Sequence, residues 1–287
     1  MRRTASALCD LLDDGFRFIL THGNGPQVGN ILRRVEIASD ELYTIPLEVC
    51  VADTQASMGY MMAQCLMNEM VSRGRAELVT TLVTTVEVDS SDAAFQSPSK
   101  PIGPRMRRAE AEHHKQRDGW AMREVAVGQF RRIVPSPLPQ RILELENIHG
   151  LASDGSLVVC CGGGGIPVVR DASGQYQGAA AVIDKDRTTA LLARQLGVRT
   201  LVILTDVDHV YLHYGQSNQR PLETIHVQEV IGLLELGNFD AGSMLPKMAA
   251  AAEFVDASQH PDATAVITNL ENARHATAGE IGTRVVK

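Results

Sequence analysis

The sequence predicts an α/β fold in which helices cover both faces of a mostly parallel sheet. Segments with strand-like and helix-like patterns alternate along the 287 residues, which is typical of βαβ units. Short apolar runs, such as residues 16–20 and 201–204, end in loops rich in glycine or aspartate. Aromatic residues make up only 4% of the chain, which argues against an all-β sandwich built around large rings.

Composition narrows the class of protein further. With 44% hydrophobic and 21% charged residues, the chain is globular rather than disordered or a coiled coil. Its net charge of −7 speaks against non-specific nucleic-acid binding. No apolar run reaches the ~18 residues that span a bilayer, and the start of the chain lacks a secretory signal. Five cysteines without a CxxC pair indicate neither a disulfide framework nor a zinc site. We therefore expect a cytoplasmic protein without a nucleic-acid or membrane partner.

The first part of the chain alternates between helix and strand patterns. Residues 4–13 carry apolar side chains on one helical face, and a glycine follows them. A short strand is expected over 16–20, followed by a glycine loop over 21–30 in which a proline suits the first position of a helix. A long helix rich in methionine and alanine is expected over 52–72, and a buried β-branched strand over 78–88.

The middle of the chain differs in composition from what precedes it. Residues 89–139 are polar, basic and interrupted by prolines, so we expect an insertion that projects from the main sheet rather than another layer of it. After this insertion the alternation resumes. Helices are expected over 142–149, 186–196, 226–236 and 247–257, and strands over 157–161, 179–184, 201–204, 263–268 and 283–286.

Three glycine-rich segments follow predicted strands and indicate where a ligand binds. They are residues 22–29, 161–167 and 239–247. In open α/β sheets the ligand crevice lies at the carboxyl ends of the strands, and glycines there let backbone amides approach an anion closely. A single such loop is usually just a turn. Four consecutive glycines are harder to explain structurally, because each costs about 0.5–1 kcal/mol relative to alanine. The Walker A and GxGxxG patterns are both missing from the sequence.

Three lysines stand out beside these segments. Lys185 lies between Asp184 and Asp186 at a strand-to-helix junction, and Lys247 lies at the start of a helix, where a cation is unfavourable unless an anion is near. Lys100 lies among prolines of the insertion. These residues have ordinary structural interpretations as well. Either Asp184 or Asp186 can cap a helix, and the three lysines can be solvated side chains. Taken together, the loops and lysines predict an α/β protein that handles phosphate groups.

Considered together, these segments resemble the carbamate kinases, within the amino acid kinase fold family. The matching segments are THGNGPQVGN, SPSKPIGP, RRIVPSP, CGGGGIPVV, AVIDKD, LTDVDHVYLHYG, AGSMLPK and GTRVV. KPIGP and CGGGGIPV are specific to the carbamate kinases within the wider fold family. The resemblance implies one domain over residues 1–287, folded as a three-layer αβα sandwich around a mainly parallel, eight-stranded sheet. It further implies a protruding lid subdomain at about 89–139 and a homodimer.

The resemblance also implies an activity. The implied reaction is reversible phosphoryl transfer between ATP and carbamate, which gives ADP and carbamoyl phosphate with Mg²⁺ as cofactor. The cellular direction would be toward ATP, in the breakdown of arginine or related nitrogen compounds.

The family's site residues carry over to numbered positions in this chain. Gly23, Asn24 and Gly25 would bind carbamate and the transferred phosphate, with Gly163, Gly164 and Gly165 lying opposite. Lys185, Lys247 and Lys100 would neutralise the transferring phosphoryl group, and Asp184 would hold the first two lysines in position. Asp206, Val207, Tyr211, Ser243 and Met244 would form the nucleotide site. His22 receives no catalytic role.

The chain departs from the family at its start. Carbamate kinases begin with a buried strand and a Gly-Gly-Asn-Ala loop, and nothing here corresponds to them. We expect either that the protein begins further upstream or that it is a relative with little activity. Two other functions remain open from the sequence: a kinase of the same fold that acts on acetylglutamate, a nucleoside monophosphate or a phosphonate, and a non-catalytic protein that binds nucleotide.

Overall fold

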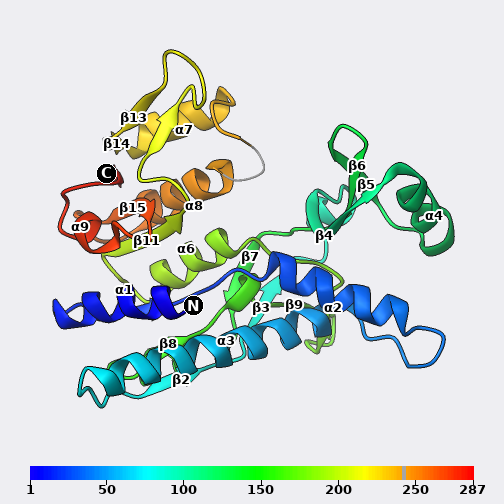
Figure 1. The fold of residues 1–287 in the computed structure, drawn as a ribbon, viewed down its shortest axis with the longest axis horizontal. Helices are drawn as coiled ribbons and strands as arrows, with labels where there is room; N and C mark the ends of the chain where they lie inside the picture. Colours follow the sequence, from blue (N-terminus) through cyan, green and yellow to red (C-terminus); the bar gives the residue numbers. More distant parts are fainter. Residues whose placement is uncertain (241–243) are drawn as a thin grey trace.

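The computed structural model describes residues 1–240 and 244–287 and has the predicted three-layer αβα architecture (Figure 1). The helices are α1 (Arg2–Asp13), α2 (Gly25–Ile37), α3 (Leu47–Ser72), α4 (Arg108–Asp118), α5 (Leu145–Ser153), α6 (Lys185–Gln195), α7 (Val227–Glu235), α8 (Met244–Ala257) and α9 (Ala273–Thr277), with two 3₁₀ turns, η1 (Ala93–Phe95) and η2 (Gly162–Gly164). None of these helices, within the residues described, is both long and apolar enough to cross a membrane.

The strands of the main body form three larger sheets and one short ribbon. They are β1 (Ile19–Leu20), β2 (Val79–Thr81), β3 (Thr85–Val88), β7 (Pro139–Ile142), β8 (Leu157–Val159), β9 (Ile166–Arg170), β10 (Tyr176–Gly178), β11 (Thr200–Thr205), β12 (Val210–Leu212), β13 (Arg220–Leu222), β14 (Thr224–His226), β15 (Thr264–Asn269) and β16 (Thr283–Val286). The sheet orders are β1-β8-β2, β10-β9-β3-β7 and β11-β15-β16-β14, and β12 pairs with β13. The pairings next to the glycine loops, β1 with β8 and β3 with β9, are parallel.

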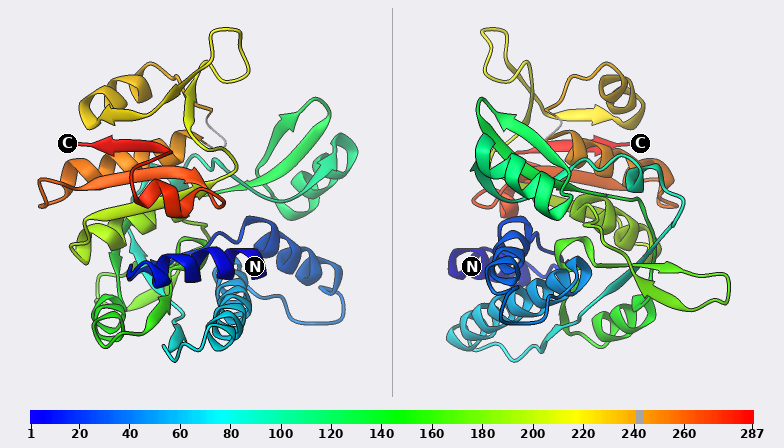
Figure 2. Two further views of the ribbon diagram at one scale, coloured as in Figure 1. Left: turned by 60° about the vertical axis from the view of Figure 1, so that its left-hand side comes forward. Right: turned by 90° about the vertical axis from the view of Figure 1, so that its right-hand side faces the viewer.

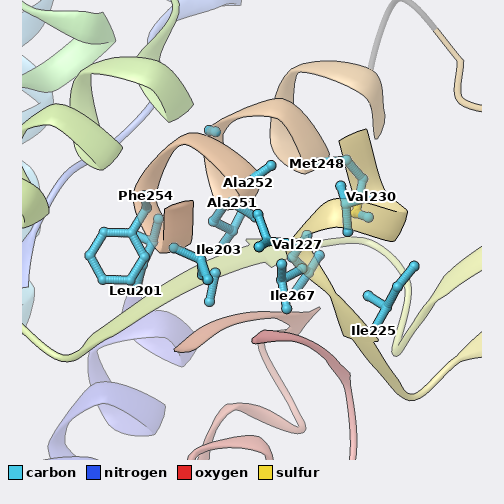
Figure 3. Close-up of a cluster of buried hydrophobic side chains, with 14 of the residues drawn as sticks. Leu201, Ile203, Ile225, Val227, Val230, Met248, Ala251, Ala252, Phe254 and Ile267 are labelled. Atoms are coloured by element: carbon cyan, nitrogen blue, oxygen red, sulfur yellow. The ribbon is translucent and has the colours of Figure 1, made fainter. Parts of the chain in front are cut away.

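The largest hydrophobic core surrounds β11, β15 and α8 (Figure 3). Residues 265–268 of β15 are all buried, so both faces of this strand are covered, as the apolar run in the sequence predicts. Figure 3 shows Phe254 beside Leu201, and Met248 beside Val230. This packing fixes α8, and therefore the position of Lys247 near its start, against the central strands.

Two predicted strands differ in the structure. The run 78–88 is divided into β2 and β3, because β2 pairs with β8 whereas β3 pairs with β9 of another sheet. The chain changes sheet at residues 82–84, where the side chain of Gln55 bonds the backbone of Thr84. The prediction of a strand over 179–184 is wrong. This segment is mostly buried but irregular, and the Val182 amide bonds the carbonyl of Pro135 instead of a strand partner.

The expected continuous eight-stranded sheet is divided in the described residues, where the strands pair in separate ladders of at most four strands. The β1 and β11 ladders are separate, and a cavity of about 760 Å³ is lined by residues from both strands. The cavity is also lined by apolar side chains of α1, and it extends to Gly23, Lys185 and Asp186.

The insertion predicted over 89–139 forms a subdomain that we call the lid. It contains β4 (Lys100–Arg107), α4, β5 (Met122–Ala126) and β6 (Gln129–Val134), with strand order β4-β6-β5. Figures 1 and 2 show it standing away from the main body. The last residues of the predicted insertion begin β7, which pairs with β3 in the main body.

The lid rests on α2 through a close backbone contact and an ionic contact. A Cβ atom at Gly29 of α2 would lie only 2.2 Å from the Cα atom of Gly103 in β4. Nearby, Arg132 of β6 lies 3.9 Å from Glu36 of α2 and 4.5 Å from the ring centroid of Trp120. Burial raises the pKa of the Glu36 carboxyl group, and the positive charge of Arg132 opposes this shift.

Enlarging Gly29 tests whether this contact sets the lid position. We expect Gly29→Ala to lower kcat about 10-fold, because two backbones must separate and Lys100 lies on the displaced strand. The measurement is steady-state kinetics of the phosphoryl transfer that the sequence predicts, with Gly150→Ala as the matched control. Gly150 lies in α5 with nothing within 4 Å of its added Cβ atom, so its kcat should not change. Equal kcat in both variants would contradict a role for the contact.

Candidate active site

Two glycine loops and the start of α6 converge at the carboxyl ends of β1 and β8. The first loop, residues 21–25, follows β1, and the second loop, residues 161–165, follows β8. The Gly163 amide donates to the carbonyl of His22 at 2.7 Å. The Thr188 hydroxyl of α6 donates to the carbonyl of Gly164 at 2.9 Å. The predicted glycine residues are therefore brought together as expected.

The second loop has a conformation that only glycine adopts easily. Gly163, Gly164 and Gly165 have φ of 65°, 92° and 88°, a region in which a Cβ atom is strained. Space is also lacking, since a Cβ atom at Gly163 would lie 2.1 Å from Nδ2 of Asn24. At Gly164 it would lie 2.6 Å from the carbonyl oxygen of Ile183. The glycine run thus allows a close approach of three backbone segments.

The three predicted lysines are held by two neighbouring carboxylates. Lys185 Nζ lies 2.5 Å from Oδ1 of Asp186, and Lys247 Nζ lies 3.4 Å from Oδ2 of the same residue. Lys100 reaches from the lid to Oδ2 of Asp184 at 3.1 Å and also donates to the carbonyl of Ile183 at 3.0 Å. The lid therefore contributes one cation to a cluster on the main body.

The expected role of Asp184 needs correction. The resemblance implies that Asp184 holds Lys185 and Lys247, but in the structure both ammonium groups contact Asp186, which is only 6% exposed. Asp184 instead caps α6, because its Oδ1 accepts from the amides of Asp186 and Arg187 at 3.0 and 3.3 Å. Residues two positions apart at a helix start project in different directions, which the motif alone does not reveal.

The electrostatics of the cluster favour an anion. Burial alone would raise the pKa of Asp184, but the Lys100 ammonium group reverses this effect and holds that pKa below its usual value. Asp184 is therefore charged at neutral pH and keeps Lys100 near the loops. The ammonium groups lie at the N-terminal end of α6, where the helix dipole adds positive partial charge. Cations, helix start and glycine amides together form a site suited to a phosphoryl group.

His22 is a neutral part of the first loop. Burial lowers the pKa of its imidazole below the usual 6.5, which a hydrogen-bonding contact of 3.2 Å between Nδ1 and the Gly23 carbonyl only partly opposes. A Cβ atom at Gly162 would lie 2.5 Å from the ring. The imidazole is therefore a packing surface between the two loops, consistent with the absence of a catalytic assignment.

The lowered pKa of His22 predicts a pH dependence of stability. Below about pH 6.5 the unfolded chain binds a proton that the folded chain resists, so this residue costs stability as pH falls toward its folded pKa. We expect the free energy of unfolding to drop more between pH 7.5 and 5.5 in the unaltered chain than in His22→Gln. Urea unfolding at several pH values measures this difference. An identical pH dependence in the two proteins would contradict it.

The predicted nucleotide residues lie after β11. Asp206 and Val207 follow this strand directly, and Tyr211 lies in β12. The Tyr211 hydroxyl donates to Asp208 Oδ1 at 2.8 Å, which lowers the pKa of that carboxyl group. Met244 begins α8 and packs against the largest core, whereas Ser243 lies outside the described residues. The structure therefore places Asp206 and Val207 at the carboxyl end of β11, and the Tyr211 side chain bonds the nearby Asp208.

The structure adds buried polar residues that the sequence analysis did not single out. Thr54 of α3 and Thr84 before β3 bond the first and second glycine loops, and Gln55 of α3 bonds Thr84. They lie far from the loops in sequence and belong to no glycine or lysine pattern, so no local signal identifies them. Asp186 can be identified from the sequence, since it belongs to the AVIDKD segment.

Comparison with known proteins places the chain in a class. The family described as the amino acid kinase family matches residues 1–269. Together with the fold, this match shows that the chain belongs to the amino acid kinase family.

Several similar proteins are carbamate kinases. A carbamate kinase from Staphylococcus haemolyticus is 42% identical over 289 residues, covering 100% of this chain and 93% of that protein. Carbamate kinase 3 from Staphylococcus aureus is 42% identical over 287 residues, with 99% and 92% covered. The structure of carbamate kinase from Giardia lamblia bound to AMP-PNP has a TM-score of 0.91 at 38% identity, with 100% of this chain and 90% of that chain covered.

Proposed function

We propose that this protein is a carbamate kinase that transfers a phosphoryl group reversibly between ATP and carbamate. The observation that carries the proposal is the set of three lysines, held by Asp184 and Asp186 between two glycine loops. The carbamate kinases that are 42% identical over nearly the whole chain support the choice of substrate. Structural neighbours at 15–16% identity support only the fold.

The chain's own residues suit the chemistry of this transfer. Toward ATP, a terminal oxygen of ADP attacks phosphorus, the bond from phosphorus to the carbamate oxygen breaks, and carbamate leaves as an anion. No general base is needed, because the attacking oxygen is already ionised. Lys185, Lys247 and Lys100 would neutralise charge on the transferring group, and amides of the glycine loops would position it. The transition state spreads charge over the phosphoryl oxygens, so fixed cations stabilise it.

We propose Mg²⁺ as the cofactor, entering with the nucleotide. Among the described residues no group of three or more His, Cys, Asp or Glu side chains could hold a metal ion by themselves. This fits an ion bound mainly through nucleotide phosphates, which Mg²⁺ prefers over all-protein sites. Asp184 would be a carboxylate able to add a ligand, in place of its contact with Lys100. When bound, the ion would supply further charge neutralisation.

We also propose a homodimer, a cytoplasmic location and a cellular direction toward ATP. The homodimer is supported by apolar side chains on the outer surface of α3, where Tyr60 is 61% and Val71 75% exposed. Unpaired cysteines throughout the chain suit a reducing cytoplasm. Analytical ultracentrifugation of the purified protein tests the dimer, and a monomer at micromolar concentration would contradict it.

The function is tested with the purified 287-residue chain. We expect ATP formation from ADP and carbamoyl phosphate in the presence of Mg²⁺, measured by a coupled assay, and no phosphorylation of acetylglutamate. Nucleotide binding without turnover would instead support the non-catalytic alternative. Activity on acetylglutamate but not on carbamate would overturn the substrate assignment while leaving the family assignment intact.

A further inference from the structure

Buried polar residues of α3 and of the segment before β3 contact both glycine loops. Thr54 and Thr84 are 0% exposed, and Gln55 is 3% exposed. Buried polar groups are costly unless they are hydrogen-bonded, and each of these three has its partners inside the protein. Thr54 and Thr84 each bond one glycine loop and Gln55 bonds Thr84, so their arrangement bears directly on the candidate active site.

Thr84 contacts both ends of the second glycine loop. Its hydroxyl accepts a hydrogen bond from the Cys161 amide at 3.0 Å and donates to the carbonyl of Leu82 at 2.9 Å. Its backbone carbonyl accepts from the Ile166 amide at 2.9 Å. Cys161 and Ile166 flank the four glycines. One residue thus fixes the two ends of a loop whose interior glycines are intrinsically mobile.

Gln55 in turn fixes Thr84. Its Oε1 accepts from the Thr84 amide at 2.7 Å, and its Nε2 donates to the Thr84 carbonyl at 3.1 Å. The side-chain amide therefore pairs with the backbone of Thr84 as a neighbouring strand would, at the point where the chain passes between sheets. A Cβ atom at Gly162 would lie 2.7 Å from Cγ of Gln55, so the stem of this side chain also packs against the loop.

Thr54 determines the orientation of Asn24 in the first loop. Its hydroxyl donates its only proton to the carbonyl of Val51 at 2.7 Å. The same oxygen can therefore only accept from Asn24, whose Nδ2 lies at 2.7 Å. The oriented amide lies against Gly163 of the second loop, at the close approach described above.

We infer that Thr54, Gln55 and Thr84 are positioning residues that hold both glycine loops in register for the transferred phosphoryl group. They act through the loops and do not themselves touch the reacting atoms. Thr54 and Gln55 belong to one 26-residue helix. One rigid element therefore positions both loops, as a preorganised site requires. This inference rests on the proposed function for its kinetic consequence but not for its geometry.

The test compares Thr84→Val with Thr84→Ser. Valine has the shape of threonine but lacks the hydroxyl group, whereas serine keeps it. We expect Thr84→Val to lower kcat about 10-fold with an unchanged KM for ADP, because a displaced loop harms the transition state more than nucleotide binding. Thr84→Ser should stay within about 3-fold of the unaltered chain. A lowered Tm with unchanged kcat at a temperature well below unfolding would show a merely structural role and overturn the inference.

Two further measurements keep the inference testable. If Thr84→Val does not fold, the pair Thr54→Val and Thr54→Ser addresses the first loop, and equal kcat and KM for carbamoyl phosphate in that pair would overturn the inference. If the unaltered chain has no turnover, the proposed function fails, and hydrogen exchange of residues 161–166 then tests the positioning alone. We expect exchange about 10-fold faster in Thr84→Val than in Thr84→Ser; equal exchange would refute it.

Discussion

Replacing Lys185 or Lys247 by alanine is expected to lower kcat by more than ~100-fold, the usual cost of removing a preorganised charge from a closed site. The two ammonium groups share one carboxylate, Asp186, and lie at the start of α6 beside the glycine loops. An alanine leaves the glycine amides and the other lysine in place, so nucleotide binding should change less than turnover.

The measurement is kcat and KM for ATP formation, with Lys115→Ala as the control. Lys115 is an exposed lysine on α4 of the lid, so its removal changes net charge equally without touching the cluster. Retained activity in both Lys185→Ala and Lys247→Ala would refute the proposed mechanism. A similar loss in Lys115→Ala would show that net charge, and not position, is responsible.

Replacing Asp186 by asparagine is the second change expected to have a large effect. The carboxylate contacts two ammonium groups at 2.5 and 3.4 Å, and asparagine has the same shape without the charge. The two ammonium groups would then lose the negative charge that holds them and would repel each other. We expect kcat to fall about 100-fold, because the cations are no longer fixed beside the glycine loops.

Asp184→Asn is the matched comparison for this prediction. Asparagine is as good a helix cap as aspartate, so α6 should begin unchanged, and only the ion pair with Lys100 is lost. We expect a decrease in kcat of about 10-fold, smaller than that of Asp186→Asn. The reverse order, measured under the same conditions, would mean that Asp184 orients Lys185 and Lys247 after all.

The sequence predicts the α/β class, the glycine loops and the three lysines, because each depends on a local pattern. Alternating apolar runs identify β8 and β11, and the four glycines mark a loop that only glycine can form. The sequence does not predict which carboxylate holds each lysine. Asp184 and Asp186 are equivalent in the motif and differ only in the direction of their side chains. Positions such as Gln55 and Thr84, which are 29 residues apart in the sequence, depend on tertiary packing alone.

The irregular segment over 179–184 shows the same limit. Its residues Ala181, Val182 and Ile183 are as apolar as a buried strand, and burial is confirmed. However, the Val182 amide bonds the carbonyl of Pro135 near the lid, and only Ala179, at the start of the segment, bonds a strand, through the carbonyl of Pro167 in β9. An apolar run predicts burial more reliably than it predicts strand pairing, because the pairing partner is chosen by the rest of the fold.

The arrangement around Trp120 has a practical consequence. Trp120 is the only tryptophan of the chain. Its ring stacks on that of His114, with 4.2 Å between the ring centroids. Arg132 also contacts the Trp120 ring and lies near Glu36 of the main body. Indole emission is sensitive to nearby charge and to solvent, so the intrinsic fluorescence of the unlabelled protein reports on the seam between lid and body. Movement of the lid when substrate is added can therefore be followed optically, in real time and without introducing a probe.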